Sequence, residues 1–206
     1  MTKYLSAAET AKVVRKILKA KFPGVKFSVR SDTYSMGSSV RVEWTDGPTT
    51  KQVDQAVGVL SGSGFDGMID MKFNISHWLS PDGSFSLAHS PGTIGSGGAV
   101  SGFDYPKPHP DAVEVSFADH ISTSRCFSTE FLEKVKAAVS SKFGGEIPTI
   151  VGDGRFKGFH FMDYNQERLY WTILSSSVLN RAGQVKCHDH LHGAIINRNK
   201  GIYAGA

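Results

Sequence analysis

Residues 90–110, which read SPGTIGSGGAVSGFDYPKPHP, interrupt the hydrophobic pattern of this 206-residue chain. Glycines loosen the first half of this stretch, and the alternating prolines of Tyr105–Pro110 favour an extended polyproline conformation in the second. Such a composition is typical of a linker or a long loop. We therefore expect two small lobes, an N-terminal one at 1–89 and a C-terminal one at 111–206, joined by a linker or long loop at 90–110.

The first lobe shows clear helix and strand patterns. Ser6 and Glu9 form a capping-box pattern, which predicts a helix that ends at Pro23-Gly24. After this helix, the alternation of apolar residues and the turn signals predict the order β-β-α-β-β. The expected elements are strands near 25–30 and 40–44, a short helix near 53–60, and strands at 71–79 and 85–89.

The second lobe combines similar patterns. A strand is expected near 113–117, and Ser128 caps a helix that closes at Gly144-Gly145. Further strands are expected near 147–151, 156–161 and 185–196. The whole pattern predicts an α+β fold in which each lobe has an antiparallel-rich sheet with its helices packed on one face.

Composition excludes several classes of protein. A hydrophobic fraction of 40% provides enough apolar material for a core, which excludes disorder along the whole chain. The net charge of +4 excludes a strongly acidic mimic of DNA and allows an anionic partner. No apolar run reaches the ~18 residues that a membrane helix needs, so we expect no membrane partner. The N-terminus lacks a secretory segment, and two cysteines, Cys126 and Cys187, suit a reducing compartment. We expect a cytoplasmic protein.

Three motifs in the first lobe occur in the order found in a known family. They are FPGVKFSVR at 22–30, WTDGP at 44–48 and FDGM at 65–68. Through these motifs, residues 6–70 resemble large polyvalent protein-associated domain 29. That family is known from proteins of phages and conjugative plasmids, some of which are thought to enter the recipient cell alongside DNA. The resemblance implies an accessory protein of a mobile element, one that blunts host defence as anti-restriction or anti-CRISPR proteins do. It implies no catalytic residues.

The first predicted helix carries a basic face. Its cations recur at i, i+3, i+4 and i+7 opposite the apolar stripe, and no acidic residue occurs between positions 12 and 30. Clustered, flexible cations are suited to phosphates, so we expect nucleic acid or a host defence protein complex as partner. The alternative is an ordinary solvated helix face. The cations are Lys12, Arg15, Lys16 and Lys19 on the helix, followed by Lys26 and Arg30.

A second candidate is the segment KGFHFMDY at 157–164, which approximates the octamer of RNA-recognition domains. On a strand, Phe159 and Phe161 would share a face on which bases could stack, with Lys157 beside them. Two departures weaken this match: His160 occupies a small-residue position, and the first strand of the lobe lacks an aromatic residue. The alternative is a strand that buries both rings in the core.

The third candidate is the segment CHDHLH at 187–192. On a strand, His188, His190 and His192 would project from one face at intervals of about 6.8 Å. Such a pattern is typical of zinc ligands and supports a metal-dependent hydrolase as the alternative function. The other interpretation is a polar strand face without metal. Because the remaining sequence indicates no cofactor and no catalytic residue, we favour a binding protein over an enzyme. The sequence leaves the oligomeric state open.

Overall fold

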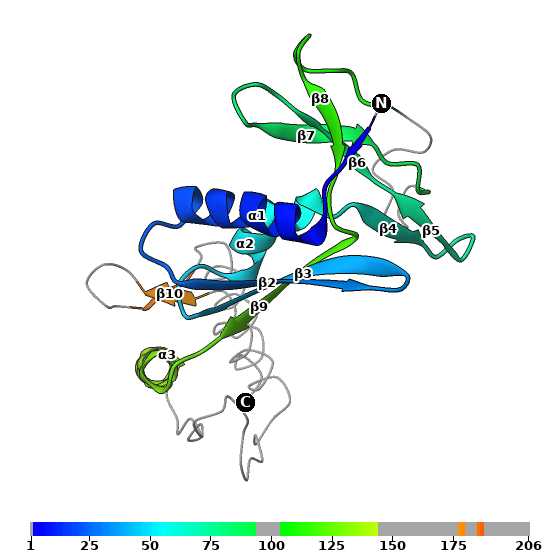
Figure 1. Cartoon of the computed structure of the whole chain (residues 1–206). Coiled ribbons are helices and arrows are strands. Elements are labelled where there is room, and N and C mark those ends of the chain that lie inside the picture. Colours follow the sequence, from blue (N-terminus) through cyan, green and yellow to red (C-terminus); the bar gives the residue numbers. More distant parts are fainter. Residues whose placement is uncertain (1, 94–103, 144–176, 180–184, 188–206) are drawn as a thin grey trace, which may run out of the picture. The chain divides into compact units, whose positions relative to one another are not determined.

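The computed structural model describes residues 2–93, 104–143, 177–179 and 185–187. The chain divides into two compact units, one formed by residues 1–43 and 53–124 and the other by 44–52 and 125–206. Helices occur together with mixed and antiparallel sheets (Figure 1), which confirms the predicted α+β class.

Along the described chain, six consecutive strands separate the first two α-helices and a short 3-10 helix from the third α-helix. They are β1 (Lys3–Tyr4), α1 (Ala7–Lys21), β2 (Phe27–Tyr34), β3 (Gly37–Thr45), α2 (Thr50–Val57), the 3-10 helix η1 (Gly58–Leu60), β4 (Ser63–Asp66), β5 (Met71–Asn74), β6 (Ser76–Leu79), β7 (Phe85–His89), β8 (Val113–Ser116), β9 (His120–Cys126), α3 (Thr129–Phe143), β10 (Ser177–Leu179) and β11 (Val185–Cys187).

Helix α1 begins with the predicted capping box. The Ser6 hydroxyl accepts the backbone N–H of Glu9 at 3.3 Å, and the Glu9 carboxylate accepts the backbone N–H of Ser6 at 2.9 Å. Together these bonds satisfy backbone donors that the helix itself leaves unpaired. The buried stripe of α1 includes Val14 and Leu18. Burial of each side chain stabilises the fold by about 1.5–3 kcal/mol.

Helix α1 packs against the sheet whose strand order is β2-β3-β9 (Figure 1). The sheet contributes buried Val29, Val40 and Val42. Their neighbours Arg30 and Arg41 are exposed, as expected when successive side chains of a strand point to opposite faces. One face of the sheet therefore carries the core with α1, and the other carries charged and polar side chains.

A second sheet has the order β1-β8-β6-β7. Strand β8 pairs antiparallel with β6, with Val113 opposite Leu79, and parallel with β1. Because β6 precedes residues 90–110 and β8 follows them, strands from both sides of the glycine- and proline-rich stretch share this sheet. Its core is the cluster of Leu60, Val115 and Phe117, against which Val13 and Ile17 of α1 also pack.

The predicted single strand at 71–79 was wrong, because β5 ends at Asn74 and β6 begins at Ser76. Between them, the Ile75 N–H donates to the Gly62 carbonyl at 2.8 Å. Strand β4, which pairs antiparallel with β5, was missed by the sequence analysis.

In the second unit, Arg125 links the turn before α2 to the start of α3. Its Nε donates to the Asp46 carbonyl at 2.8 Å, and its guanidinium stacks on the rings of Phe127 and Phe131. Burial lowers the pKa of Arg125 to about 10, which still leaves it charged at neutral pH. Ser128 caps α3 as predicted, since its hydroxyl accepts the Phe131 N–H at 3.1 Å.

Candidate binding surface on helix α1

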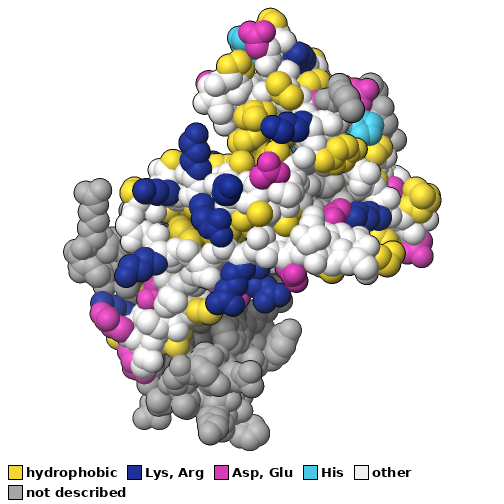
Figure 2. Space-filling model, in the orientation of Figure 1, with side chains coloured by type: hydrophobic (Ala, Val, Ile, Leu, Met, Phe, Trp, Pro, Cys, Tyr) yellow, Lys and Arg dark blue, Asp and Glu magenta, His cyan; other side chains and the backbone are white. Residues whose placement is uncertain are grey.

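The structure brings the four predicted helix cations onto one exposed face of α1. Lys12, Arg15, Lys16 and Lys19 are all exposed, and Figure 2 shows Lys and Arg side chains gathered over α1 and the neighbouring strand. The first and last are separated by two helical turns, a rise of about 10 Å. We call these four residues the α1 basic face.

Arg15 is exposed and also forms a hydrogen bond with the backbone of the neighbouring strand. Its Nη2 donates to the Val29 carbonyl at 2.6 Å. Val29 lies on β2, which is at the edge of its sheet, so Arg15 occupies one backbone acceptor that an edge strand leaves open. Removal of Arg15 would therefore disturb the fold as well as the charge.

The three lysines of the α1 basic face are not engaged in this way. Within the described part of the chain, Lys12, Lys16 and Lys19 make no hydrogen bond or ion pair. The acidic residue that shares the helix, Glu9, is held in the capping box. Hydrogen bonds from the Ser6 backbone and hydroxyl lower the pKa of Glu9, which keeps its carboxylate charged in that role. The lysine ammonium groups thus remain available to an external anion.

The two remaining cations of the predicted basic face are exposed but lie elsewhere. Lys26 precedes β2, in the segment between the helix and the strand. Arg30 alternates with buried Val29, so its side chain leaves the sheet on the face opposite α1. The structure therefore groups the four helix cations and does not group Arg30 with them.

The other two candidate sites lie outside the described residues. The predicted base-stacking strand with Lys157, Phe159 and Phe161 stays a prediction, and so does the predicted zinc site at His188, His190 and His192. Among the residues that the structure does describe, no group of three or more His, Cys, Asp or Glu side chains could hold a metal ion.

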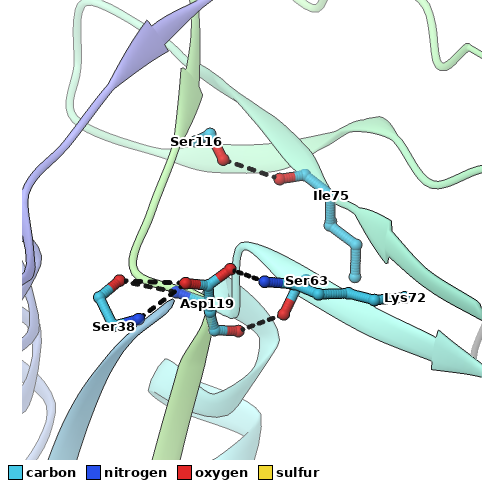
Figure 3. A network of polar contacts seen from close by, with 6 residues as sticks. All are labelled: Ser38, Ser63, Lys72, Ile75, Ser116 and Asp119. Carbon is cyan, nitrogen blue, oxygen red and sulfur yellow. Dashed lines mark hydrogen bonds and ion pairs between the residues drawn. The ribbon is translucent and has the colours of Figure 1, made fainter. Parts of the chain in front are cut away.

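A polar network around Asp119, which the sequence analysis missed, connects three parts of the first unit (Figure 3). One carboxylate oxygen accepts the Ser38 N–H at 2.8 Å, and the other pairs with the Lys72 ammonium. The backbone carbonyl of Asp119 accepts the Ser63 hydroxyl at 3.0 Å. In the same view, the Ser116 hydroxyl donates to the Ile75 carbonyl at 3.2 Å. The partners of Asp119 are up to 81 positions away, so no local pattern could have revealed them.

The electrostatics of Asp119 indicate a structural role. Burial alone would raise the pKa of its carboxyl, but the Lys72 ammonium and the Ser38 donors together lower it. A general base needs a pKa near the working pH and access to a substrate proton. The lowered pKa makes Asp119 a weak base, and its bonds to Ser38 and Lys72 join β3, the β4–β5 hairpin and the start of β9.

His77 is a second residue that the sequence analysis did not single out. Its ring is buried, with Nε2 at 2.8 Å from the Val59 carbonyl and an edge-on contact to the ring of Phe117. Nδ1 is buried and has no hydrogen-bond partner among the described residues. Burial lowers the pKa of His77, which favours a neutral ring in the core.

Each of the three sequence motifs contains a turn or a turn-stabilising contact. In the first, Gly24 has a φ of +88°; in the second, the Trp44 indole N–H donates to the Pro48 carbonyl at 2.9 Å. In the third, the Asp66 carboxylate accepts the N–H of Met68 at 2.9 Å and the N–H of Thr93 at 2.7 Å. In each motif, the Gly, Trp or Asp therefore supports the local backbone conformation.

Comparison with known families confirms the family resemblance found in the sequence. The family model described as large polyvalent protein associated domain 29 matches residues 5–128. The chain belongs to this family. The match begins just before α1 and ends just before α3, well beyond the 6–70 region that carries the sequence motifs. Membership in a family of polyvalent-protein domains implies a protein of a mobile genetic element.

No curated protein and no solved structure gives a significant match to this chain. Among the described residues, no helix has the length and apolarity that crossing a membrane requires.

Proposed function

We propose that this mobile-element protein acts by binding, and that its α1 basic face contacts the phosphates of nucleic acid. The observation that carries the proposal is the set of three exposed lysines, Lys12, Lys16 and Lys19, which form no hydrogen bond or ion pair in the described part of the chain. Their burial in a partner's phosphate backbone would release counterions, which is the main source of affinity in sequence-independent binding.

The geometry supports contact along a backbone rather than with a single phosphate. The four cations are spread over about 10 Å along the helix. Duplex DNA carries one negative charge per ~1.7 Å of its axis, so the four cations can contact several successive phosphates. If all four cations neutralise phosphates, log K should fall with log salt with a slope of about −3.6.

The cellular role that we propose is protection of the mobile element in the host cytoplasm. A host defence complex, of the restriction or CRISPR kind, recognises nucleic acid. A protein that covers phosphates could shield that nucleic acid, and the same lysines could instead dock on an acidic surface of the complex. Family membership supports the origin of the protein in a mobile element. The α1 basic face supports binding to phosphates or to an acidic protein surface.

The direct test compares two charge-reversal variants by fluorescence anisotropy with labelled duplex DNA, single-stranded DNA and RNA across a salt series. Lys12→Glu with Lys16→Glu reverses two of the four charges and leaves the Arg15 bond to Val29 intact. The matched control, Arg41→Glu with Lys51→Glu, makes the same charge change at two exposed positions outside α1. Both variants should keep a free energy of unfolding within about 0.5 kcal/mol of the wild type.

We expect the α1 variant to lose at least tenfold in affinity and its salt slope to flatten by about 2. The control variant should retain the wild-type slope. Wild-type protein that binds none of the three nucleic acids would contradict the nucleic-acid proposal. Equal losses in both variants would show that only net charge matters.

A further inference from the structure

Helix α1 offers a partner positive charge and few other contacts. Besides the α1 basic face and Glu9, which is held in the capping box, its exposed side chains are those of Ala8, Ala20 and Lys21. Proteins that bind single strands stack the bases on aromatic rings, and proteins that read a sequence place Arg, Asn or Gln side chains against base edges. Lysines act as flexible point charges, and the guanidinium of Arg15 already bonds to the Val29 carbonyl. This surface therefore favours contact with a phosphate backbone over contact with bases.

The aromatic rings near α1 in the chain do not form a stacking platform beside the lysines. Phe22 directly follows α1, is half-buried and packs against Phe27, with 6.0 Å between the ring centroids. Tyr34 on β2 is an odd number of positions from buried Val29, so its ring projects from the sheet face opposite α1. Tyr4 is 74% exposed, but it precedes the N-cap and is therefore at the N-terminal end of α1.

The cations of the α1 basic face are spread around the helix as well as along it. Successive residues of an α-helix are turned by about 100°, so Arg15 lies about 60° to one side of Lys12 and Lys16 about 40° to the other. By the same count, Lys19 lies within about 20° of Lys12. The opposite side of α1 is the buried stripe, which packs against the sheet. The α1 basic face is thus a convex ridge with positive charge on both flanks.

We infer that the α1 basic face binds B-form duplex DNA along its major groove without reading the base sequence, an inference that rests on the proposed function and names its ligand. The major groove is about 12 Å wide, and an α-helix with its side chains is about 10–12 Å in diameter, so the ridge fits between the two strands. Cations on its two flanks then face the phosphates that line the two sides of the groove. The major groove of duplex RNA is too deep and narrow for side chains to enter.

Fluorescence anisotropy with duplex DNA, its single strand and duplex RNA of the same length tests the choice of ligand. We expect the full chain to bind duplex DNA at least tenfold more tightly than either alternative. Four phosphate contacts predict a salt slope of about −3.6 on duplex DNA, against about −2.8 on a single strand. Equal or tighter binding of single-stranded DNA or duplex RNA would overturn this inference and leave the proposed function standing. Protein that binds none of the three would overturn both.

A second experiment tests the groove and the lack of base reading. Duplexes of A·T-rich, G·C-rich and mixed sequence should bind within about threefold of one another, because one mismatched base pair costs a sequence-specific protein about fivefold or more. On the A·T-rich duplex, the major-groove ligand methyl green should displace the protein. Netropsin, a cation that occupies the minor groove, should not displace it. Tenfold discrimination among the sequences, or displacement by netropsin alone, would overturn the inference.

Single-residue variants test which side of α1 meets the duplex. Lys16→Ala and Lys19→Ala each remove one contact, so each should flatten the salt slope on duplex DNA by about 0.9. The matched control is Lys21→Ala, which removes an exposed lysine of the same helix that lies about 180° from Lys12 around its axis. This control, and Tyr4→Ala, should keep the wild-type slope and affinity. If Lys21→Ala flattens the slope as much as Lys16→Ala, or Tyr4→Ala loses tenfold in affinity, the assignment of the ridge to the major groove is wrong.

Discussion

Substitution of Gly62 by alanine should be among the most damaging single-methyl changes in the first unit. A Cβ at this position would lie 2.2 Å from the Phe117 carbonyl oxygen and 3.0 Å from its carbon. Both atoms are backbone, so no side-chain rotation can relieve the overlap. Residue 62 must move away from the segment that connects β8 to β9.

The magnitude follows from the bonds that this movement breaks. The Gly62 N–H donates to the Ala118 carbonyl at 2.8 Å, and the next residue, Ser63, donates to the Asp119 carbonyl at 3.2 Å. Each bond contributes about 1 kcal/mol, and overpacking adds about 1–3 kcal/mol. Alanine recovers about 0.4–1 kcal/mol by restricting the unfolded chain. The net loss should be about 3 kcal/mol, or about 6–12 °C in melting temperature for a chain of this size.

Circular dichroism melting of three glycine variants tests this reasoning. At Gly64 the atoms nearest to an added methyl all belong to the ring of Phe73, the first at 2.3 Å, and a ring can rotate aside. Gly64→Ala should therefore lose only about 1 kcal/mol. At Gly58 the nearest atoms lie at an ordinary 3.5 Å, so Gly58→Ala should be nearly neutral. If the Gly62→Ala and Gly58→Ala variants have the same melting temperature, the close approach of residue 62 to Phe117 is refuted.

Two further predictions concern the polar groups of the first unit. Asp119→Ala should lower the free energy of unfolding at neutral pH by about 2 kcal/mol, because it removes charge-assisted hydrogen bonds that are partly exposed. Since the folded-state pKa of Asp119 is lowered, this difference from wild type should shrink as pH falls below about 4, as urea titrations can show. His77 has a lowered folded-state pKa, so the unfolded chain takes up its proton first and wild-type stability should fall as pH drops below about 6.5. His77→Gln keeps a donor for the Val59 carbonyl and should reduce the dependence of stability on pH below about 6.5. An unchanged dependence would show that another group is responsible for it.

The sequence by itself determined the local elements of the first unit. The capping box of Ser6 and Glu9, the buried stripe of α1 and the strand that contains Val40 and Val42 all depend on residues within a few positions of one another. The same spacing placed the lysines of the α1 basic face together, because a helix brings residues i, i+3, i+4 and i+7 to one side. Three separate motifs also identified the family.

Only the tertiary structure decided which distant segments meet. The pairing of β8 with β6 across residues 90–110, the bond from Arg15 to Val29 and the Asp119–Lys72 pair each join positions that share no local pattern. Val29 is buried on the sheet face that α1 covers, so the next residue, Arg30, points to the opposite face, away from the helix cations. The sequence alone does not say which face α1 covers. A short-range pattern specifies the conformation of one segment, whereas the partner of that segment is selected by the packing of the whole unit.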